Sequence, residues 1–443
     1  MISVDTPPLP PLVSGSRPAI GHLSQVLRDA EQLIRAGYAE HGEVFRVSVL
    51  GKPAVFIFGE HTRQFFEDPA LDIRSAYGFL GRMLGQDVFF LAEDEEYRRQ
   101  REIVLNRFQG RHQLGTYVEV MDHEARGLVQ QLGEEGEFDI LSQFGPLVLR
   151  VAARCFLGEN FASGLPRDFY SEIKALSGGV HFFLPNSLPL PSVVRSRKAR
   201  VRLERAITDM IQARRDRPVE PADFLQSLAT AEYQDGQPVP VDKLVGLILL
   251  LTWSGQDTTA GLMAWAMIDL LRDPAALERV RAEVEQIVAD GTLDLAGVGR
   301  LDYTSACLRE TERLHPVAHI ISRRATSDLT VGEFTIPRGA LVFASPAVSH
   351  RLDGVWEAPH EYRPDRFLGS ESRELRQSLI GFGGGIHRCL GQHFATLEMK
   401  IVLARLIARF DLELMTRDPR PAAGSMASKA PQGQCLVRYR ARR

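Results

Sequence analysis

The sequence predicts a mainly α-helical protein with a small lobe rich in β-strands. Apolar residues recur at three- and four-residue spacing over long stretches, which is the period of an amphipathic helix. Residues 43–58 are instead rich in Val, Ile and Phe, with a Gly-Lys-Pro break at 51–53, which predicts two strands joined by a turn. Neither a linker nor a repeat interrupts the chain, so we expect a single domain over residues 1–443.

The predicted elements follow in a simple order. Residues 1–20 form a proline-rich, extended lead-in, and the strand pair comes next. A second set of strands is predicted over 329–346, and CLVRYRA forms a short last strand. Residues 178–194 are apolar and rich in proline, which indicates a mobile loop over a cavity or, equally well, a packed connector. The helical pattern is clearest over 116–133, 275–288 and 394–410.

Composition and charge are those of a soluble globular protein. Of the 443 residues, 44% are hydrophobic and 25% are charged, and the formal net charge of −3 favours neither nucleic acid nor an anionic membrane. The N-terminus has no basic region followed by an apolar stretch, so we expect no signal peptide. The apolar stretch 244–271 carries five polar residues at its middle, which favours a buried central helix over a membrane span. We expect a cytoplasmic monomer without a transmembrane anchor.

One cysteine lies in an unusual setting. In GFGGGIHRCLGQHFA, residues 381–395, a glycine-rich turn precedes Cys389, and a helical pattern follows it. The N–H groups at a helix start favour a thiolate, which is the form that binds metals. The glycines allow backbone N–H groups to approach the sulfur and leave room for a flat, bulky group. No pair of cysteines has metal-ligand spacing, and the others fit buried apolar positions: Cys155, Cys307 and Cys435.

These residues resemble the haem-binding motif of the cytochrome P450 family. Phe382, Gly385, Cys389 and Gly391 fit F-x-x-G-x-x-x-C-x-G, and His387 stands at its basic position. The resemblance implies the cytochrome P450 fold, with haem b between a long central helix and the cysteine loop. It also implies a Cys389 thiolate as the axial ligand of the iron, O2 as cosubstrate and NAD(P)H as the indirect source of electrons.

The long central helix carries SGQDTT, which resembles the family motif for dioxygen activation. At Gly255 the helix has no side chain, so its backbone can open locally and admit a ligand. Asp257 and Thr258 place an acid beside an alcohol, and such a pair can relay protons to bound dioxygen. The resemblance therefore assigns a catalytic role to Asp257 and Thr258.

The same resemblance assigns further residues to haem. Arg323 and Arg101 would meet the haem carboxylates, which need donors when they are buried, and Arg324 competes with Arg323 for this role. Tyr97 precedes Arg101 by one helical turn, where the family often has tryptophan. The expected haem contacts are Tyr97, Arg101, Gly255, Arg323, Phe382, Gly383, His387, Cys389 and Gly391.

Three charged residues are expected to be structural. In CLRETERLHP, Glu310 and Arg313 lie three residues apart, and Pro316 ends the helix. Arg366 follows in EYRPDRF. In the family, the matching glutamate and two arginines lock the helical core near the haem loop.

Within the family, the sequence resembles the branch of sterol 14α-demethylases and retinoid hydroxylases. SAYGFLGRMLGQDVFF keeps Tyr77 and Gly85 of the demethylase substrate loop, whereas Arg82, Leu84 and Asp257 depart from that branch. We therefore expect a large lipophilic substrate without specifying a sterol. The candidate pocket residues are Tyr77, Phe79, Leu80, Met83, Phe89, Phe182, Phe183, Ser254, Ala318, His319 and Ile320.

The expected activity is insertion of one oxygen atom from O2 into a terpenoid-, steroid- or polyketide-like molecule, as in soluble bacterial enzymes of secondary metabolism. No flavin or iron–sulfur domain fits in the chain, so a separate ferredoxin or flavodoxin-type donor with its reductase would supply electrons, docking near Arg388. Three alternatives stay open: a peroxide-driven or oxygen-independent haem enzyme, a haem sensor without catalysis, and a haem-free thiol enzyme with His387 as its base.

Overall fold

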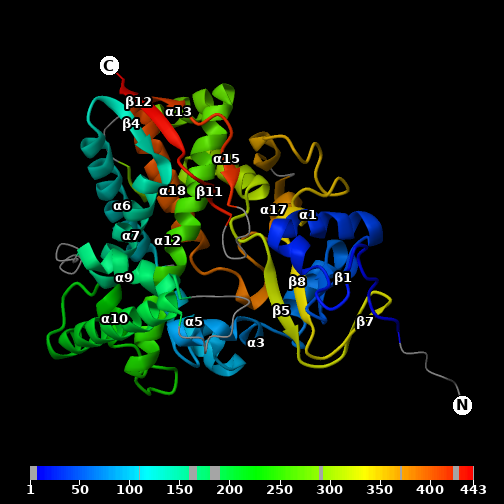
Figure 1. Ribbon diagram of the computed structural model, residues 1–443. Helices are drawn as coiled ribbons and strands as arrows, with labels where there is room; N and C mark the ends of the chain where they lie inside the picture. Colours follow the sequence, from blue (N-terminus) through cyan, green and yellow to red (C-terminus); the bar gives the residue numbers. More distant parts are fainter. Residues whose placement is uncertain are drawn as a thin grey trace, which may run out of the picture. The chain divides into compact units, whose positions relative to one another are not determined.

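Helices make up most of the chain, and short strands form small sheets, as the sequence predicts (Figure 1). The contacts of the computed structural model divide the chain into two compact units. Unit 1 comprises Met1–Tyr77, Arg309–Cys389 and Pro421–Lys429. Unit 2 comprises Gly78–Leu308, Leu390–Arg420 and Ala430–Arg443. The structure describes residues 7–108, 110–158, 167–179, 190–288, 293–369, 372–422 and 429–442.

Unit 1 is built on a five-stranded sheet with the order β1-β2-β8-β5-β3. β1 (Val44–Val49) and β2 (Lys52–Ile57) form the antiparallel hairpin that the sequence predicts. β2 pairs in parallel with β8 (Leu341–Ala344), which pairs with β5 (Ile321–Ala325), and β3 (Leu71–Asp72) lies at the edge. The sheet therefore joins the two strand-rich segments that lie far apart in the sequence.

Both faces of this sheet are covered by apolar side chains. Along β2, Val55 and Ile57 pack into one buried cluster, and Phe56 packs into another, because successive side chains of a strand point to opposite faces. β6 (Leu329–Val331) and β7 (Phe334–Ile336) form a separate hairpin. The helices of unit 1 are α1 (Leu23–His41), η1 (Gly59–His61), α2 (Thr62–Glu67), α3 (Arg74–Tyr77), α16 (Pro346–Ser349), η4 (Pro364–Phe367), α17 (Ser372–Ser378) and η5 (Gly385–His387).

Unit 2 is a helical body around α12 (Val241–Arg272), which contacts α7 (Ile140–Leu157), α10 (Pro191–Asp216) and α18 (Gln392–Arg409). Most of α12 is buried, which agrees with the central helix expected there. α15 (Asp302–Leu314) begins in unit 2 and ends in unit 1. Among the described residues, the other helices of unit 2 are η2 (Gly78–Leu80), α4 (Gly81–Leu84), η3 (Phe89–Leu91), α5 (Asp94–Phe108), α6 (Arg111–Leu132), α9 (Arg167–Ser177), α11 (Phe224–Ala229), α13 (Pro274–Ile287) and α14 (Leu295–Gly299).

α7 is the one described helix that is long and apolar enough to cross a membrane by length and composition. Of its residues, 67% are buried inside the protein. Its main neighbour is α12, and the Asp139 side chain caps its start by accepting a hydrogen bond from the N–H of Ser142. This burial is typical of a core helix.

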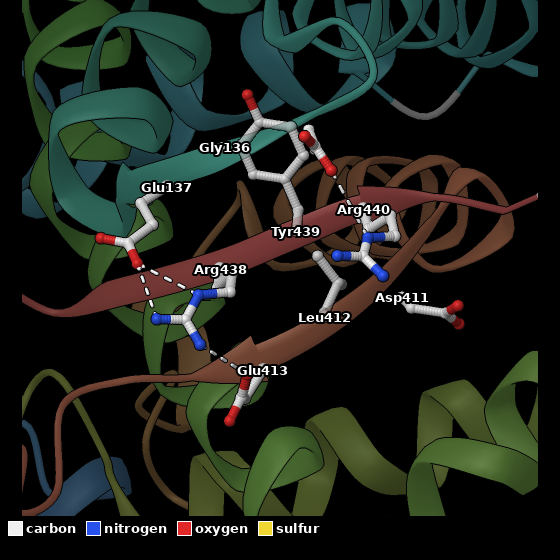
Figure 2. A pocket seen from close by; sticks show the side chains of 9 residues that line it. Gly136, Glu137, Asp411, Leu412, Glu413, Arg438, Tyr439 and Arg440 are labelled. Carbon is white, nitrogen blue, oxygen red and sulfur yellow. Dashed lines mark hydrogen bonds and ion pairs between the residues drawn. The ribbon is translucent and has the colours of Figure 1, made fainter.

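A small sheet of unit 2 carries a ladder of ion pairs on a hollowed surface (Figure 2). β12 (Leu436–Ala441) lies between β4 (Glu135–Asp139) and β9 (Phe410–Leu414). Arg438 bridges Glu137 and Glu413 across the three strands. These side chains are exposed, so each pair contributes at most about 1 kcal/mol. We therefore interpret this hollow as a solvated sheet face. A separate two-stranded sheet is formed by β10 (Arg420–Pro421) and β11 (Pro431–Gln432), each two residues long.

Candidate active site

The cysteine loop closes on itself within unit 1. The N–H of Cys389 donates to the carbonyl of Phe382 at 2.9 Å, so residues 382–389 form a closed turn that contains η5. α18 begins three residues after the cysteine. Cys389 is exposed, whereas the other cysteines are buried: Cys155, Cys307 and Cys435. The thiol in the glycine-rich loop is thus accessible to a ligand.

Packing against α2 explains two glycines of this loop. A Cβ at Gly384 would lie 2.8 Å from the ring of Phe66, and a Cβ at Gly385 would lie 2.6 Å from the Phe66 carbonyl oxygen. Gly385 also has a φ of +60°, which favours glycine. The sequence had suggested that these glycines make room at the sulfur. The structure adds a steric cause, because α2 packs closely against the loop.

A buried ion cluster lies at the C-terminal end of α15. Arg313 donates to Glu310 Oε1 through Nη2 at 2.7 Å, and Arg366 Nε lies 3.1 Å from Glu310 Oε2. Arg313 also donates to three backbone carbonyls, those of His350, Pro359 and Glu361. The structure therefore brings together the three residues that the sequence expects to lock the core. The cluster joins α15 to the segment around η4.

The two candidate arginines of β5 differ in burial. Arg323 is 3% exposed, and its guanidinium lies 5.4 Å from the centre of the Phe65 ring. Its Nη1 donates to the carbonyl of Ser322 at 2.9 Å. Arg324 is half-buried and donates to the carbonyl of Gly339. Burial favours Arg323 over Arg324 as the partner of a buried carboxylate.

On α5, Tyr97 and Arg101 share one helix face. Arg101 Nη1 donates to the Tyr97 hydroxyl at 3.2 Å. Tyr97 is 1% exposed and packs edge-on against Phe89, with ring centres 5.1 Å apart. The backbone N–H of Phe89 donates to Gln100 Oε1 at 2.6 Å, so α5 also fixes η3. One helix thus positions two expected haem contacts and one pocket candidate.

The polar segment of α12 interrupts an otherwise buried helix. Ser254, Asp257 and Thr258 are exposed, although the helix is buried on both sides of them. The Thr258 hydroxyl donates to the carbonyl of Ser254 at 2.7 Å. α12 runs continuously through Gly255, the glycine at which the helix can open locally. A Cβ at Gly255 would meet no atom of the described residues within 4 Å.

The protein around the Asp257 carboxyl makes it a weaker acid than usual, although part of the side chain is exposed. Desolvation raises the pKa of its carboxyl, and the positive charge of Lys174 on α9 opposes this effect. The fraction of Asp257 that carries a proton near neutral pH is therefore larger than for an ordinary aspartate. An acid of this kind can hold and release a proton at Oδ.

The pocket candidates lie in different environments, and Phe182 and Phe183 fall outside the described residues. The Tyr77 hydroxyl accepts a hydrogen bond from the N–H of Ser322 at 3.3 Å. Desolvation lowers the pKa of His319 to about 4, so its ring is neutral at pH 7. Three of the described candidates are buried: Leu80, Met83 and His319. Five are half-buried, namely Tyr77, Phe79, Phe89, Ala318 and Ile320, and Ser254 is exposed.

Sequence reasoning missed two buried polar residues beside the cysteine loop. His350 Nε2 accepts a hydrogen bond from the N–H of Ile380 at 2.9 Å. Glu312 accepts one from the N–H of Gly381. The sequence held one sign of this role: Glu312, the second acid of RETERLHP, lies between the apolar residues Leu308 and Leu314 on a buried helix.

The chemistry of these residues fits a thiolate-ligated haem. The loop offers an accessible thiol on a closed turn, and α12 offers a helix face without a side chain at Gly255. The buried Arg323 offers a cation for a haem carboxylate. His387 is half-buried in η5 within the same loop. Each unit therefore carries groups of the type that haem needs.

Comparisons with known proteins agree with this fit. The family model described as Cytochrome P450 matches residues 10–436. A sterol 14alpha-demethylase of Mycobacterium bovis is 29% identical, with 98% of each chain covered. An obtusifoliol 14-alpha demethylase of Triticum aestivum is 30% identical, also with 98% of each covered. The solved structure of cyanobacterial CYP120A1 with retinoic acid bound has a TM-score of 0.87 and 25% identity, covering 99% of this chain and 100% of that one.

The match extends over both units. The family model begins in the lead-in of unit 1 and ends in the last strand of unit 2. Its length, together with relatives that align from end to end, makes the assignment independent of any single motif. The chain therefore belongs to the cytochrome P450 family.

Proposed function

We propose that this protein oxidises a large terpenoid-, steroid- or polyketide-like molecule in secondary metabolism, using electrons from a separate redox partner. As a cytochrome P450, it is a monooxygenase that carries haem b with the Cys389 thiolate as axial ligand, and it uses O2 with electrons that come indirectly from NAD(P)H. A thiolate-ligated haem, when bound, supplies the electron density that favours O–O cleavage. The remaining steps depend on residues of this chain.

The exposed acid–alcohol pair on α12 carries this proposal. Asp257 and Thr258 are polar and exposed within a helix that is buried on both sides of them. The raised pKa of Asp257 favours its protonated form more than in an ordinary aspartate, and the Thr258 oxygen can accept a hydrogen bond while its hydroxyl donates to the carbonyl of Ser254. We propose that these two side chains deliver protons to dioxygen. A peroxide-driven enzyme or a rearrangement would not need this delivery.

Haem would be held by groups from several elements. We propose that Arg323 and Arg101 neutralise its carboxylates, and that Tyr97 orients Arg101 through the hydrogen bond between them. Phe382, Gly383, His387 and Gly391 of the cysteine loop, with Gly255 of α12, would contact the macrocycle. We propose that the two units act as one catalytic domain, which is supported by a family model that spans both.

The substrate proposal rests on the pocket candidates and on the relatives. The relatives carry the names of sterol demethylases, and the structural neighbour holds retinoic acid. Most described candidates are apolar and half-buried or buried, as is typical of a site for lipophilic molecules. We propose that the described residues Tyr77, Phe79, Leu80, Met83, Phe89, Ser254, Ala318, His319 and Ile320 line this site, together with Phe182 and Phe183.

A separate protein would supply the electrons. We propose a ferredoxin or a flavodoxin-type protein with its reductase, docking on the side of the exposed Arg388 next to the thiolate. We further propose that the protein is a cytoplasmic monomer.

The test is turnover with O2 and a reconstituted electron supply. Purified holoprotein would receive NADPH, a ferredoxin and its reductase, with 18O2 and substrates chosen by spin-state shifts from terpenoid, steroid and polyketide panels. The proposal expects one labelled oxygen atom in each product molecule. Activity with peroxide but none with O2 and reductant would support the peroxide-driven alternative instead, and binding without turnover would support a sensor.

A further inference from the structure

A buried carboxyl contacts the residue at which the cysteine loop begins. Glu312 lies on α15, is 6% exposed, and accepts a hydrogen bond from the N–H of Gly381. Gly381 directly precedes Phe382, whose carbonyl closes the turn by accepting the N–H of Cys389. α15 is therefore linked to the thiolate through one backbone N–H and one closed turn.

The contact leaves no room for a side chain at the loop start. A Cβ at Gly381 would lie 2.7 Å from Glu312 Oε1 and 3.0 Å from Glu312 Cγ. The carboxyl is enclosed and cannot easily move away, because Glu312 is buried on a helix of the core. Glu312 and Gly381 thus form a matched pair, in which glycine is the residue that fits beside this glutamate.

A second buried side chain anchors the preceding residue. His350 is fully buried, and its Nε2 accepts the N–H of Ile380 at 2.9 Å. Desolvation, with Arg351 and Arg313 nearby, lowers the pKa of His350 to about 3, so the ring is neutral and can accept. Two consecutive backbone N–H groups are therefore bound by buried side chains just before the turn.

The Glu312 carboxyl, which binds the N–H of Gly381, is mostly protonated near pH 7. Desolvation raises the pKa of Glu312 to about 8, and the positive charges of Arg388 and Arg309 oppose this rise without cancelling it. Of these cations, Arg309 lies on α15 and Arg388 precedes Cys389. Among the described residues, Glu312 Oε1 has no hydrogen-bond partner, which adds to the cost of ionisation there.

We propose that Glu312 is a positioning residue for the haem thiolate: by binding the Gly381 N–H, it fixes the start of the turn that ends at Cys389. The inference rests on the proposed function in so far as Cys389 ligates haem. It adds a role for a residue whose described partner is the backbone N–H at the start of the turn. His350 supports the same segment from the neighbouring residue.

Two variants and a control test this role in the holoprotein. Glu312→Leu removes the acceptor, and we expect conversion of the thiolate-type carbonyl complex to the form without thiolate ligation to become about fivefold faster. Glu312→Gln keeps a carbonyl acceptor for Gly381 and restores a rate close to that of the unmodified protein. Glu374→Leu, at an exposed acid on α17, leaves the rate unchanged. Equal rates for Glu312→Leu and the unmodified protein would overturn the proposal.

The pH dependence of the reduction potential of the haem iron provides a second test of Glu312. As the pH rises through about 8, Glu312 gains a negative charge, which disfavours the reduced iron, so the potential falls with a midpoint near that pH. Glu312→Gln removes this step. The absence of this step in the unmodified protein would contradict the placement of a titrating Glu312 beside the loop, and its persistence in Glu312→Gln would show that another group causes it.

Amide hydrogen exchange covers the case in which the variants lose haem or fail to fold. In the unmodified protein, the amides of Ile380 and Gly381 should exchange at least tenfold more slowly than exposed loop amides. Rapid exchange of the Gly381 amide would refute the proposed hydrogen bond from this N–H to Glu312. This measurement needs no haem, so it separates failure of the anchor from failure of the proposed function, which would appear as a protein without a thiolate-type carbonyl complex.

Discussion

Arg313 donates to both carboxylate oxygens of Glu310, through Nη2 at 2.7 Å and through Nε at 3.0 Å, and both side chains are fully buried. The carboxylate also accepts the N–H of Arg363 at 2.9 Å and pairs with Arg366. Two buried guanidinium groups thus share one carboxylate. Removal of that carboxylate would leave both cations without their counter-charge.

Glu310→Gln should therefore destabilise the protein strongly. We expect a loss of about 3–5 kcal/mol in the free energy of unfolding, measured by urea titration, because two buried cations lose their partner. Glu278→Gln is the matched control, since Glu278 forms the same i,i+3 pair with Arg281 but its own side chain is 69% exposed. Its loss should stay below about 0.5 kcal/mol. Similar losses in both variants would contradict a special role for the buried cluster.

Arg323→Gln should weaken haem retention. A buried guanidinium that pairs with a carboxylate of haem contributes a charge-assisted hydrogen bond, so its loss should speed haem transfer to an apo-globin acceptor about tenfold or more. Arg324→Gln, at the half-buried neighbour, should change this rate less than twofold. The reverse order of the two rates would assign the role to Arg324.

Thr258→Val should separate electron consumption from product formation. The substitution removes the hydroxyl at nearly constant volume, and we expect at least about a tenfold drop in product formed per NADPH consumed, because proton delivery fails. Thr252→Val provides the control, since the Thr252 hydroxyl also donates to the carbonyl four residues earlier, at 2.8 Å. Its coupling should stay within twofold. An unchanged ratio in Thr258→Val would remove this residue from the proton path.

His319 should make the protein less stable in mild acid. Desolvation, with Lys429 nearby, lowers the pKa of His319 from 6.5 to about 4, so between these values the unfolded chain binds a proton that the folded chain does not. The contribution of the neutral ring is complete above pH 6.5 and is lost as the pH falls toward 4. The loss is at most about 1.4 kcal/mol per pH unit.

His319→Gln tests this pH dependence. The free energy of unfolding should fall less between pH 6.5 and 4 in His319→Gln than in the unmodified protein. His360→Gln, at an exposed histidine, should leave the slope unchanged. Parallel slopes for His319→Gln and the unmodified protein would show that this ring does not titrate as described.

Much of the architecture follows from local sequence patterns. The hairpin of β1 and β2 was predicted because segments rich in Val, Ile and Phe flank a Gly-Lys-Pro break, and α12 because a long apolar stretch carries polar residues at its middle. The cysteine loop was predictable because its spacing is specific. These features depend on residues that are close together in the chain.

The remaining features depend on contacts between distant segments. In the sequence, Glu312 is one of several polar residues of a helix. Its hydrogen bond to Gly381 forms only when folding brings the two segments together. The packing of Phe66 on Gly384 and Gly385 is equally invisible in the sequence. Whether α12 opens at Gly255 also cannot be predicted from the sequence, because glycine permits a helix to open without requiring it to do so, and here the helix is continuous.

The most direct test of the account is the absorption spectrum of the carbonyl complex of the reduced protein. We predict the red-shifted Soret band of a thiolate-ligated haem in the unmodified protein and in Cys435→Ser, and its loss in Cys389→His. A colourless protein after haem-replete expression, or the same band in Cys389→His, would contradict ligation of the iron by Cys389.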